Sequence, residues 1–239
     1  MKAKPHIKAG NFMSEKIWRN EIKYVCSNEA LIRIESSIRN ICRPDAHADQ
    51  RGVYRVRSLY FDDYYDTCFH ENEDGVAPRK KYRIRIYNEN VDQIFMECKY
   101  KERDMIRKDS CRITEAECIE LMRGNGWAAG SGQEPLLKYF CAEMALRAYA
   151  PKIIVQYERM AYIYQIGNIR ITFDRNISMS NMVGDFLKKE LAVRPVMPVN
   201  RHVLEVKYSG MIPDYIYNAL QVSDLRQTNF SKYYISRKI

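Results

Sequence analysis

The stretch YRIRIYNENVDQIFMECKYK, residues 82–101, contains two segments in which charged and apolar side chains alternate. In the first segment arginines alternate with isoleucines. In the second, after the turn-like NEN, charged residues alternate with Met, Cys and Tyr. A period of two is typical of a β-strand with one apolar and one charged face. If the charged faces point to solvent they say little about function, whereas charged faces that point inward would line a binding site.

The same alternation recurs in at least six predicted strands. The residues that share a face are Glu21 with Lys23, Arg55 with Arg57, Arg83 with Arg85, Glu97 with Lys99 and Lys101, Tyr157 with Arg159, Arg170 with Asp174, and Glu205 with Lys207. For a single strand the simplest interpretation is a half-exposed antiparallel sheet with its charges in water. The frequent use of arginine and the repeated Glu-x-Lys pattern favour binding faces instead.

Closure of such a sheet into a barrel would place these charges in the lumen. Burying so much positive charge is unfavourable without an anionic ligand. Arginine side chains bind phosphate oxygens in pairs, and lysine supplies a compact charge. Glutamates between them offer the oxygen ligands that divalent cations prefer. The pattern therefore predicts a metal-assisted site for a polyanion with several phosphates, and no nucleic-acid duplex, which a barrel lumen would not admit.

The overall charge and the cysteine content agree with this prediction. The formal net charge of +9 and the pI near 9.1 favour anionic partners: nucleic acid, phosphorylated metabolites, polyphosphate or acidic membranes. Seven cysteines without a CxxC pair indicate free thiols in a reducing cytoplasm. The chain shows no secretory signal and no apolar stretch long enough for a transmembrane span, so we expect a soluble, cytoplasmic protein.

The 239 residues contain no clear domain boundary, so we expect a flexible basic lead at 1–15 and a single domain at 16–239. Beyond the opening stretch, strands are predicted at 19–26, 54–63, 152–164, 168–174 and 202–209. Helices are predicted at 27–41, 114–124, 136–149 and 184–191, with another starting near residue 213. Many strands with few helices between them suggest an α+β protein with an antiparallel sheet or barrel and helices outside.

Several local signals have definite interpretations. Ser27 or Asn28 is a plausible cap for the first helix, and Thr114 with Glu117 forms a capping box. The glycine-rich residues 124–135 lack the Lys-Ser/Thr of a P-loop and are expected to form a loop. Asp62 and Asp63, at a strand end, favour a turn or capping role over metal binding.

Eight short motifs, in order, resemble the VTC domain of polyphosphate polymerases. They are NEIKY, RSLYFDD, KYRIRIY, FMECKYK, VQYERMAY, IRITFD, LEVKYSGMIPDYI and FSKYY, and together they span roughly residues 16–237. That domain belongs to the triphosphate tunnel metalloenzymes, which are related to the CYTH proteins. The resemblance implies an antiparallel eight-stranded β-barrel with helices packed outside. It also implies metal-dependent transfer of the γ-phosphate of ATP to a growing inorganic polyphosphate chain, with Mn²⁺ or Mg²⁺.

The resemblance also implies roles for individual residues. Glu205 matches a metal-binding glutamate, and Lys232 matches a lysine near the reacting phosphates. Together with Arg83 and Arg85 these form the expected catalytic set. The expected substrate-binding residues are Lys23, Arg57, Lys99, Arg159, Arg170 and Lys207. The expected metal ligands are Glu205, Glu97 and Glu21, and the pair Arg107 and Lys108 is a supporting candidate.

The chain departs from eukaryotic relatives because it lacks their SPX domain and membrane helices. It resembles a stand-alone, bacterial-type catalytic domain, for which coupling to a membrane would require a partner membrane protein. Two alternatives to the polymerase stay open: a tunnel-type phosphatase that hydrolyses triphosphate, tripolyphosphate or a nucleotide, and a non-catalytic module that binds polyphosphate or nucleotide. A nucleic-acid-binding protein is the least favoured interpretation.

Overall fold

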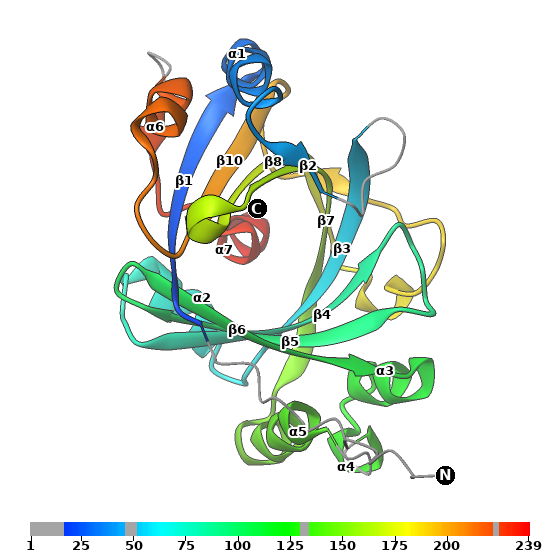
Figure 1. Cartoon of the computed structure of the whole chain (residues 1–239). Coiled ribbons are helices and arrows are strands. Elements are labelled where there is room, and N and C mark those ends of the chain that lie inside the picture. Colours follow the sequence, from blue (N-terminus) through cyan, green and yellow to red (C-terminus); the bar gives the residue numbers. More distant parts are fainter. Residues whose placement is uncertain (1–16, 46–51, 130–133, 222–224) are drawn as a thin grey trace, which may run out of the picture.

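Eight long antiparallel strands form a closed barrel around a central lumen (Figure 1). The computed structural model describes residues 17–45, 52–129, 134–221 and 225–239. The strands are β1 (Arg19–Ser27), β3 (Val53–Asp62), β4 (Arg79–Tyr87), β5 (Ile94–Glu102), β6 (Met105–Ile113), β7 (Ala150–Tyr164), β8 (Ile169–Ser180) and β10 (Arg201–Tyr208). Their order is β7-β3-β4-β5-β6-β1-β10-β8, and pairing of β7 with β8 closes the ring. The expected barrel is confirmed, while the basic lead at 1–15 lies outside the described residues.

Three short strands extend the sheet at its edges. These are β2 (Arg43–Pro44), β9 (Arg194–Pro195) and β11 (Arg226–Gln227), which pair with β7, β8 and β1. The pairing of β11 matters for the site because it brings the C-terminal segment beside β1, where Thr228 N–H donates to the carbonyl of Lys23 over 2.9 Å.

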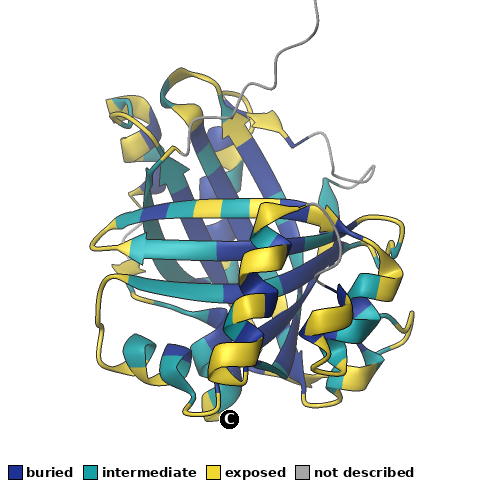
Figure 2. Cartoon of the chain, turned by 90° about the horizontal axis from the view of Figure 1, so that it is seen from below, coloured by how far each residue is buried: buried dark blue, intermediate teal, exposed yellow. Residues whose placement is uncertain are grey.

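The helices surround the barrel. They are α1 (Asn28–Ile38), α2 (Thr67–Glu73), α3 (Glu115–Met122), α4 (Gly126–Ala129), α5 (Pro135–Arg147), α6 (Asp214–Leu220) and α7 (Lys232–Lys238). Helices α1 and α6 cover the apolar face of β1, β8 and β10, and a second apolar core lies under α3, α4 and α5. In Figure 2, which shows the molecule from below, the helices in front carry exposed residues on their outer side and buried residues toward the strands. None of the described helices combines the length and the hydropathy that crossing a bilayer requires.

Closure settles which way the charged faces point. Register pairs such as Lys23 with Glu205 and Arg83 with Glu97 are direct cross-strand neighbours, so their side chains share the lumen side. The alternating residues Ile84 and Met96 are fully buried under the helices on the outer side. The charged faces of these strands are therefore internal, and a half-exposed sheet is excluded for them; the face shared by Arg55 and Arg57 is the exception and points outward.

Local capping matches the sequence-based expectations. The Ser27 hydroxyl accepts the N–H of Ala30 over 3.2 Å, and Thr114 with Glu117 completes a capping box at α3. Asp62 and Asp63 have a capping role, because Asp62 accepts the N–H groups of Cys68 and Phe69 at the start of α2. Both acids are buried, and neither lines the lumen cavity.

Four local predictions differ from the structure. Strand β6 was not anticipated, because its charged residues Arg107, Lys108 and Asp109 are consecutive and obscure the alternation. Helix α2 was also missed. The expected loop at 124–135 contains the short helix α4. The helix expected at 184–191 is wrong: the chain forms a single 3-10 turn, Val183–Asp185, and then an irregular segment held by Arg57.

Arg57 lies outside the lumen, contrary to its predicted place among the substrate-binding residues. Its neighbour Ser58 faces the lumen, where it accepts a hydrogen bond from Arg85, so Arg57 must face the other way. The Arg57 guanidinium donates to the carbonyls of Phe186 and Lys188, over 2.9 and 2.5 Å. It also donates to Gln156 Oε1 over 2.8 Å. Arg57 therefore anchors the irregular segment to the barrel wall.

We expect Arg57→Met to lower the melting temperature by roughly 6–12 °C, because unpaired buried carbonyls cost about 3 kcal/mol. The side chain is only 1% exposed. As a control, Arg55→Met removes the alternate, half-exposed arginine of the same strand and should shift melting by no more than about 2 °C. Calorimetry gives both values. Unchanged melting together with weaker binding of tripolyphosphate would instead return Arg57 to the substrate-binding residues.

Candidate active site

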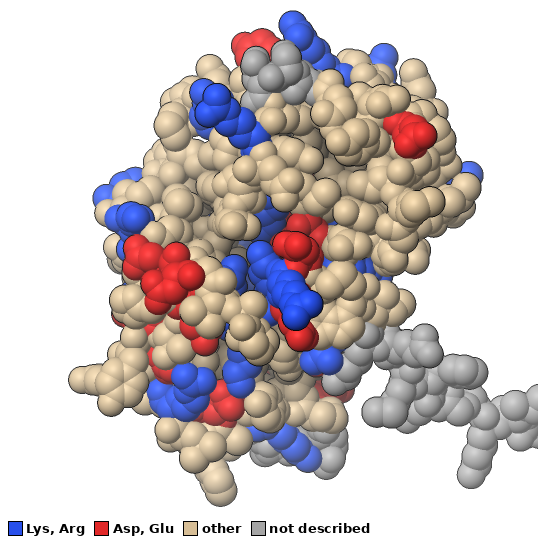
Figure 3. Space-filling model, turned by 90° about the vertical axis from the view of Figure 1, so that its left-hand side faces the viewer, with Lys and Arg blue, Asp and Glu red and all other residues tan. Residues whose placement is uncertain are grey.

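A cavity inside the barrel gathers most of the predicted residues. Of the described residues that line it, eleven are Lys or Arg and three are Asp or Glu, and its volume is about 140 Å³. Figure 3 shows a hollow on one face of the molecule with basic side chains in and around it. Such an excess of inward positive charge requires counter-charge, which the protein supplies only in part.

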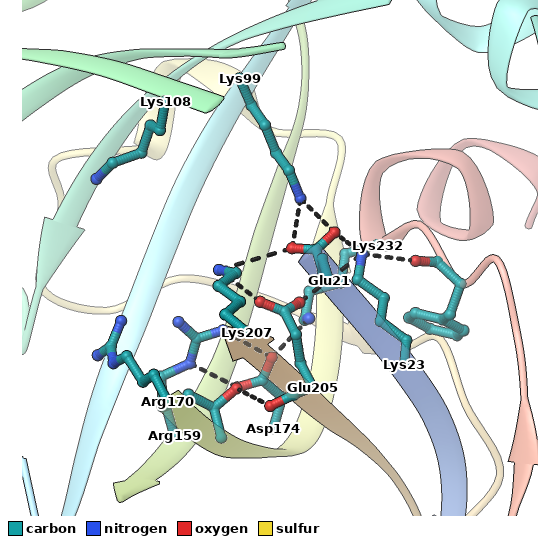
Figure 4. A network of polar contacts seen from close by, with 12 residues as sticks. Glu21, Lys23, Lys99, Lys108, Arg159, Arg170, Asp174, Glu205, Lys207 and Lys232 are labelled. Carbon is teal, nitrogen blue, oxygen red and sulfur yellow. Dashed lines mark hydrogen bonds and ion pairs between the residues drawn. The ribbon is translucent and has the colours of Figure 1, made fainter. Parts of the chain in front are cut away.

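Glu21 and Glu205 form the centre of the first cluster in the lumen (Figure 4). They come from adjacent strands β1 and β10, and Lys207 Nζ lies 2.6 Å from Glu205 and 3.6 Å from Glu21. Lys23 Nζ also approaches both acids, at 3.3 and 3.7 Å, and Lys99 Nζ lies 2.7 Å from Glu21. Because two lysines contact both carboxylates, the two acids lie close together.

Both glutamates are ionised at neutral pH. Burial opposes ionisation, but the charges of Lys23, Lys99 and Lys207 outweigh it and lower the pKa of Glu21 to about 2. Burial is likewise outweighed by Lys207, Lys23 and Lys232, which hold the pKa of Glu205 well below its usual value. Two close, anionic carboxylates suit Mg²⁺ or Mn²⁺, which often bind through one or two carboxylates plus phosphate oxygens.

The described residues include no group of three or more acids, histidines or cysteines that could hold a metal ion by itself. Glu21 and Glu205 therefore fit a divalent cation that completes its coordination with substrate oxygens and water.

Glu97 belongs to a second cluster, with Arg83, Arg85 and Lys108. Its carboxylate lies 2.7 Å from Arg83, 3.4 Å from Arg85 and 2.6 Å from Lys108. Burial opposes its ionisation, but these three cations hold the pKa of Glu97 well below its usual value. None of the ion pairs described for Glu97 involves a lysine that contacts Glu21 or Glu205. With every oxygen engaged by a cation, Glu97 is placed to orient the two arginines.

A third cluster centres on Asp174, an acid that sequence reasoning placed on a charged face but not among the site residues. Arg159 donates to both its oxygens, over 2.7 and 2.8 Å, and Lys232 Nζ lies 2.6 Å from Oδ2. Lys232 also lies 4.8 Å from the centre of the Tyr157 ring. Burial is outweighed by Arg159 and Lys232, and the pKa of Asp174 is lowered. Its pairing with a lysine 58 positions later is not visible in the sequence pattern.

The remaining candidates occupy other positions. Arg170 lies on the lumen face of β8 and binds Asp45 over 2.6 Å and the Tyr54 hydroxyl over 2.9 Å. It lines a second, wider cavity of about 870 Å³ that shares Arg83, Arg85, Arg159 and Lys207 with the first. Arg107 stacks on the Tyr100 ring at 4.2 Å, whereas Lys108 faces Glu97. The supporting pair is thus split between two faces.

Nine of the predicted residues therefore line one cavity together: Lys23, Lys99, Lys207, Arg83, Arg85, Arg159, Lys232, Glu21 and Glu205. Glu97 and Asp174 lie against its cations, Arg170 lies further along the tunnel, and Arg57 is outside. The site also includes Tyr60 and Tyr157, whose hydroxyls accept hydrogen bonds from Arg83 and Arg85. Three further cations, Arg79, Lys81 and Lys101, lie toward one end of the cavity. The sequence signal for these three cations was their spacing: Arg79 and Lys81 continue the alternation of Arg83, and Lys101 continues that of Lys99.

Acid should destabilise the ligand-free protein. Because the pKa of Glu21 is about 2 when folded against an ordinary 4.5, its contribution is present above about pH 4.5 and lost as pH falls toward 2. We expect a loss of about 3 kcal/mol from this group, so the melting temperature should fall steeply between these values. Glu21→Gln should flatten that part of the curve. A melting temperature that stays constant from pH 5 to pH 2 would contradict this expectation.

Comparisons with known proteins agree with this geometry. The sequence model of the VTC domain matches residues 18–239. The structure of HpAC1 from Hippeastrum, described as a putative adenylyl cyclase with a dominant triphosphatase activity, is similar with a TM-score of 0.55 and 11% identity, over 92% of this chain and 95% of that one. A putative adenylate cyclase from Bacillus halodurans is similar with a TM-score of 0.51 and 12% identity, over 85% and 86%. These two likenesses concern the fold alone. None of the curated proteins matches the sequence.

Proposed function

This chain belongs to the VTC domain family and has the triphosphate tunnel fold, and on that premise we propose that it is an ATP:polyphosphate phosphotransferase. It transfers the γ-phosphate of ATP to a growing inorganic polyphosphate chain. The observation that carries the proposal is the cavity inside the closed barrel, in which eleven cations meet three acids, two of them a close anionic pair. A linear polyphosphate supplies the missing negative charge along such a lumen.

Binding of the triphosphate rests on side chains that are already oriented. Arg83 and Arg85 are held by Glu97, and Arg159 is held by Asp174, so their remaining N–H groups can donate to phosphate oxygens without much loss of side-chain entropy. Lys23, Lys99 and Lys207 add point charges nearby.

Glu21 and Glu205 are the residues that would hold Mn²⁺ or Mg²⁺. When bound there, the cation would neutralise charge on the phosphates. The ion pairs of the two glutamates with Lys23, Lys99 and Lys207 keep both carboxylates ionised and ready before binding.

The transfer step requires positioning more than covalent help. A terminal oxygen of the polyphosphate chain attacks the γ-phosphorus of ATP, the bond from that phosphorus to the β,γ-bridging oxygen breaks, and ADP leaves. The attacking phosphate oxygen is already anionic, so no side-chain base is needed. Lys232, at the start of α7 beside Arg159 and Asp174, is placed to stabilise the transferring group or the leaving oxygen.

Hydrolysis is the second candidate, because the structurally similar HpAC1 is described as having a dominant triphosphatase activity. In that reaction water replaces the polyphosphate acceptor, and the same cations bind the triphosphate. A non-catalytic binding module would use the cations in the same way without turnover. The seven cysteines, all free and mostly well buried, support a reducing cytoplasm as the place of either reaction.

The deciding experiment incubates purified protein with ATP and Mn²⁺ or Mg²⁺, with and without a short polyphosphate primer. Polyphosphate is resolved on gels while ADP and free phosphate are quantified. Long chains with matching ADP and little free phosphate support the polymerase. Free phosphate without chains supports the hydrolase, and tight polyphosphate binding without either product leaves the binding module.

A further inference from the structure

The barrel wall is incomplete along one edge of β1. On the opposite edge, β1 pairs with β10 without interruption from Asn20 to Ser27. Among the described residues, β6 pairs with β1 only at Arg19 and Asn20, because β6 begins at Met105. From Glu21 onward this edge of β1 therefore lacks a partner among the eight barrel strands.

Residues 225–231, which we call the strap, occupy this gap. Within the strap, β11 pairs with β1, and the N–H of Thr228 donates to the carbonyl of Lys23 over 2.9 Å. At the other end of the strap, the hydroxyl of Ser231 accepts a hydrogen bond from Lys81 of β4 over 3.2 Å. The strap thus crosses from β1 to β4, past the ends of β5 and β6.

The strap forms part of the cavity wall. Residues 227–231 line the cavity together with the candidate catalytic residues. Lys23 connects the strap to the site itself, because its ammonium group donates to the carbonyl of Phe230 over 3.0 Å and lies 3.3 Å from Glu21. A ligand that reaches Lys23 from this side of the barrel has to pass the strap.

Few contacts hold the strap between its two ends. Leu225 and Phe230 pack partly against the two apolar cores, and the four residues between them are polar. Within the part of the chain that the structure describes, none of these four side chains makes a hydrogen bond or an ion pair, and only backbone bonds attach them to β1. A segment with so few buried contacts opens at a lower free energy than the strands around it.

Helix α7, which directly follows the strap, is attached much more firmly. The Tyr233 hydroxyl donates to buried Asp62 over 2.5 Å, and Arg237 binds Asp66 over 2.9 Å. Lys232 itself is held by its ion pair with a buried aspartate. The strap can therefore move while α7 keeps Lys232 in the cavity.

We propose that the strap is a gate, which opens away from β1 to admit a phosphate ligand through the side of the barrel and then closes over it. The identity of that ligand rests on the proposed function, whereas the opening is a property of the ligand-free protein. Ligand and gate are coupled through Lys23, because a phosphate that binds this ammonium group competes with the carbonyl of Phe230.

A reversible cross-link tests the gate. Tyr24 and Gln227 are direct cross-strand neighbours, so cysteines at these two positions have Cα atoms close enough for a disulfide. In the double variant Tyr24→Cys/Gln227→Cys, we expect oxidation to slow the association of tripolyphosphate by at least about 10-fold, and reduction to restore the rate. Rapid filtration with radiolabelled tripolyphosphate, in the absence of metal, gives the association rate.

The double variant Asn20→Cys/Tyr208→Cys is the matched control. These two residues are also cross-strand neighbours, but they join β1 to β10 on the complete edge, so their cross-link leaves the strap free. Its oxidation should leave the association rate unchanged. The seven native cysteines are buried, and the single variants Tyr24→Cys and Gln227→Cys, treated with the same oxidant, show whether the effect requires the cross-link.

A second measurement needs no ligand. The N–H of Thr228 is bonded to β1, so its hydrogen exchange reports opening of the strap directly. We expect this N–H to exchange at least about 100-fold faster than the β10 amides that pair with β1. Oxidation of Tyr24→Cys/Gln227→Cys should slow its exchange.

Equal association rates before and after oxidation would overturn the gate, because the ligand would then enter by another opening. An equal effect of the control cross-link would overturn it as well, as would a Thr228 N–H that exchanges as slowly as the β10 amides. Failure of the wild type to bind tripolyphosphate would contradict the proposed function instead, and hydrogen exchange would still decide whether the strap opens.

Discussion

Glu205→Gln is expected to lower metal-dependent turnover by at least about 100-fold. Glutamine keeps the size of the side chain and removes its charge, so the close carboxylate pair with Glu21 is lost. Glu205 is 5% exposed and contacts Lys207 and Lys23. Because the substitution removes its negative charge, the net charge of the lumen becomes more positive by one unit. Binding of tripolyphosphate without metal should therefore be unchanged or tighter while catalysis fails.

This divergence of binding and turnover distinguishes loss of a metal ligand from loss of structure. Turnover is measured across a titration of Mn²⁺, and tripolyphosphate affinity is measured by calorimetry without metal. Glu97→Gln is the control, because Glu97 orients Arg83 and Arg85. It should raise the KM for ATP and leave the metal concentration for half-maximal rate unchanged. Turnover of Glu205→Gln within about 3-fold of wild type would exclude Glu205 as a metal ligand.

Lys232→Met is expected to lower kcat by about 100-fold with a much smaller change in KM. Lys232 is 9% exposed, begins α7 and lies against Asp174 and the Tyr157 ring. Its ammonium group is thereby held in the cavity, where it can bind charge that develops as the phosphoryl group moves. Methionine preserves most of the volume, and Arg159 still pairs with Asp174, so folding should persist.

Lys238→Met supplies the matched control, because Lys238 ends the same helix on the exposed surface beside Glu73. It should leave kcat, KM and the melting temperature unchanged. Steady-state kinetics and thermal melting are compared for the three proteins. A large rise in KM with normal kcat in Lys232→Met would assign Lys232 to ground-state binding and contradict a role in transfer.

The C-terminal helix connects folding with chemistry in this protein. Tyr233, next to Lys232, donates its hydroxyl to buried Asp62 over 2.5 Å, and Asp62 also caps α2. Arg237, also in α7, binds Asp66 at the start of α2. These contacts fix the position of α7 against the barrel and thereby bring a residue near the end of the chain into a cavity built by β-strands.

Resemblance and periodicity contributed differently to the expectations. Periodicity predicted which residues share a face, as for Glu97 with Lys99, but left open whether the sheet is open or closed. The family resemblance supplied closure, and the ring of strands confirms it. Neither periodicity nor the resemblance predicted strand β6. Its charged residues are consecutive in the sequence, and only pairing with β5 shows which of them share a face.

What the sequence by itself determined are local properties: the alternation of charged and apolar side chains, the caps at Ser27 and Thr114, and the excess of positive charge. Backbone geometry within a few residues fixes these. Only the tertiary structure decided that Arg57 points outward, because β3 is buried on both faces from Val56 onward and its lumen face is set by pairing with β4. It also decided that Asp174 meets Lys232, since that contact joins a strand to a distant helix through packing that no local pattern encodes.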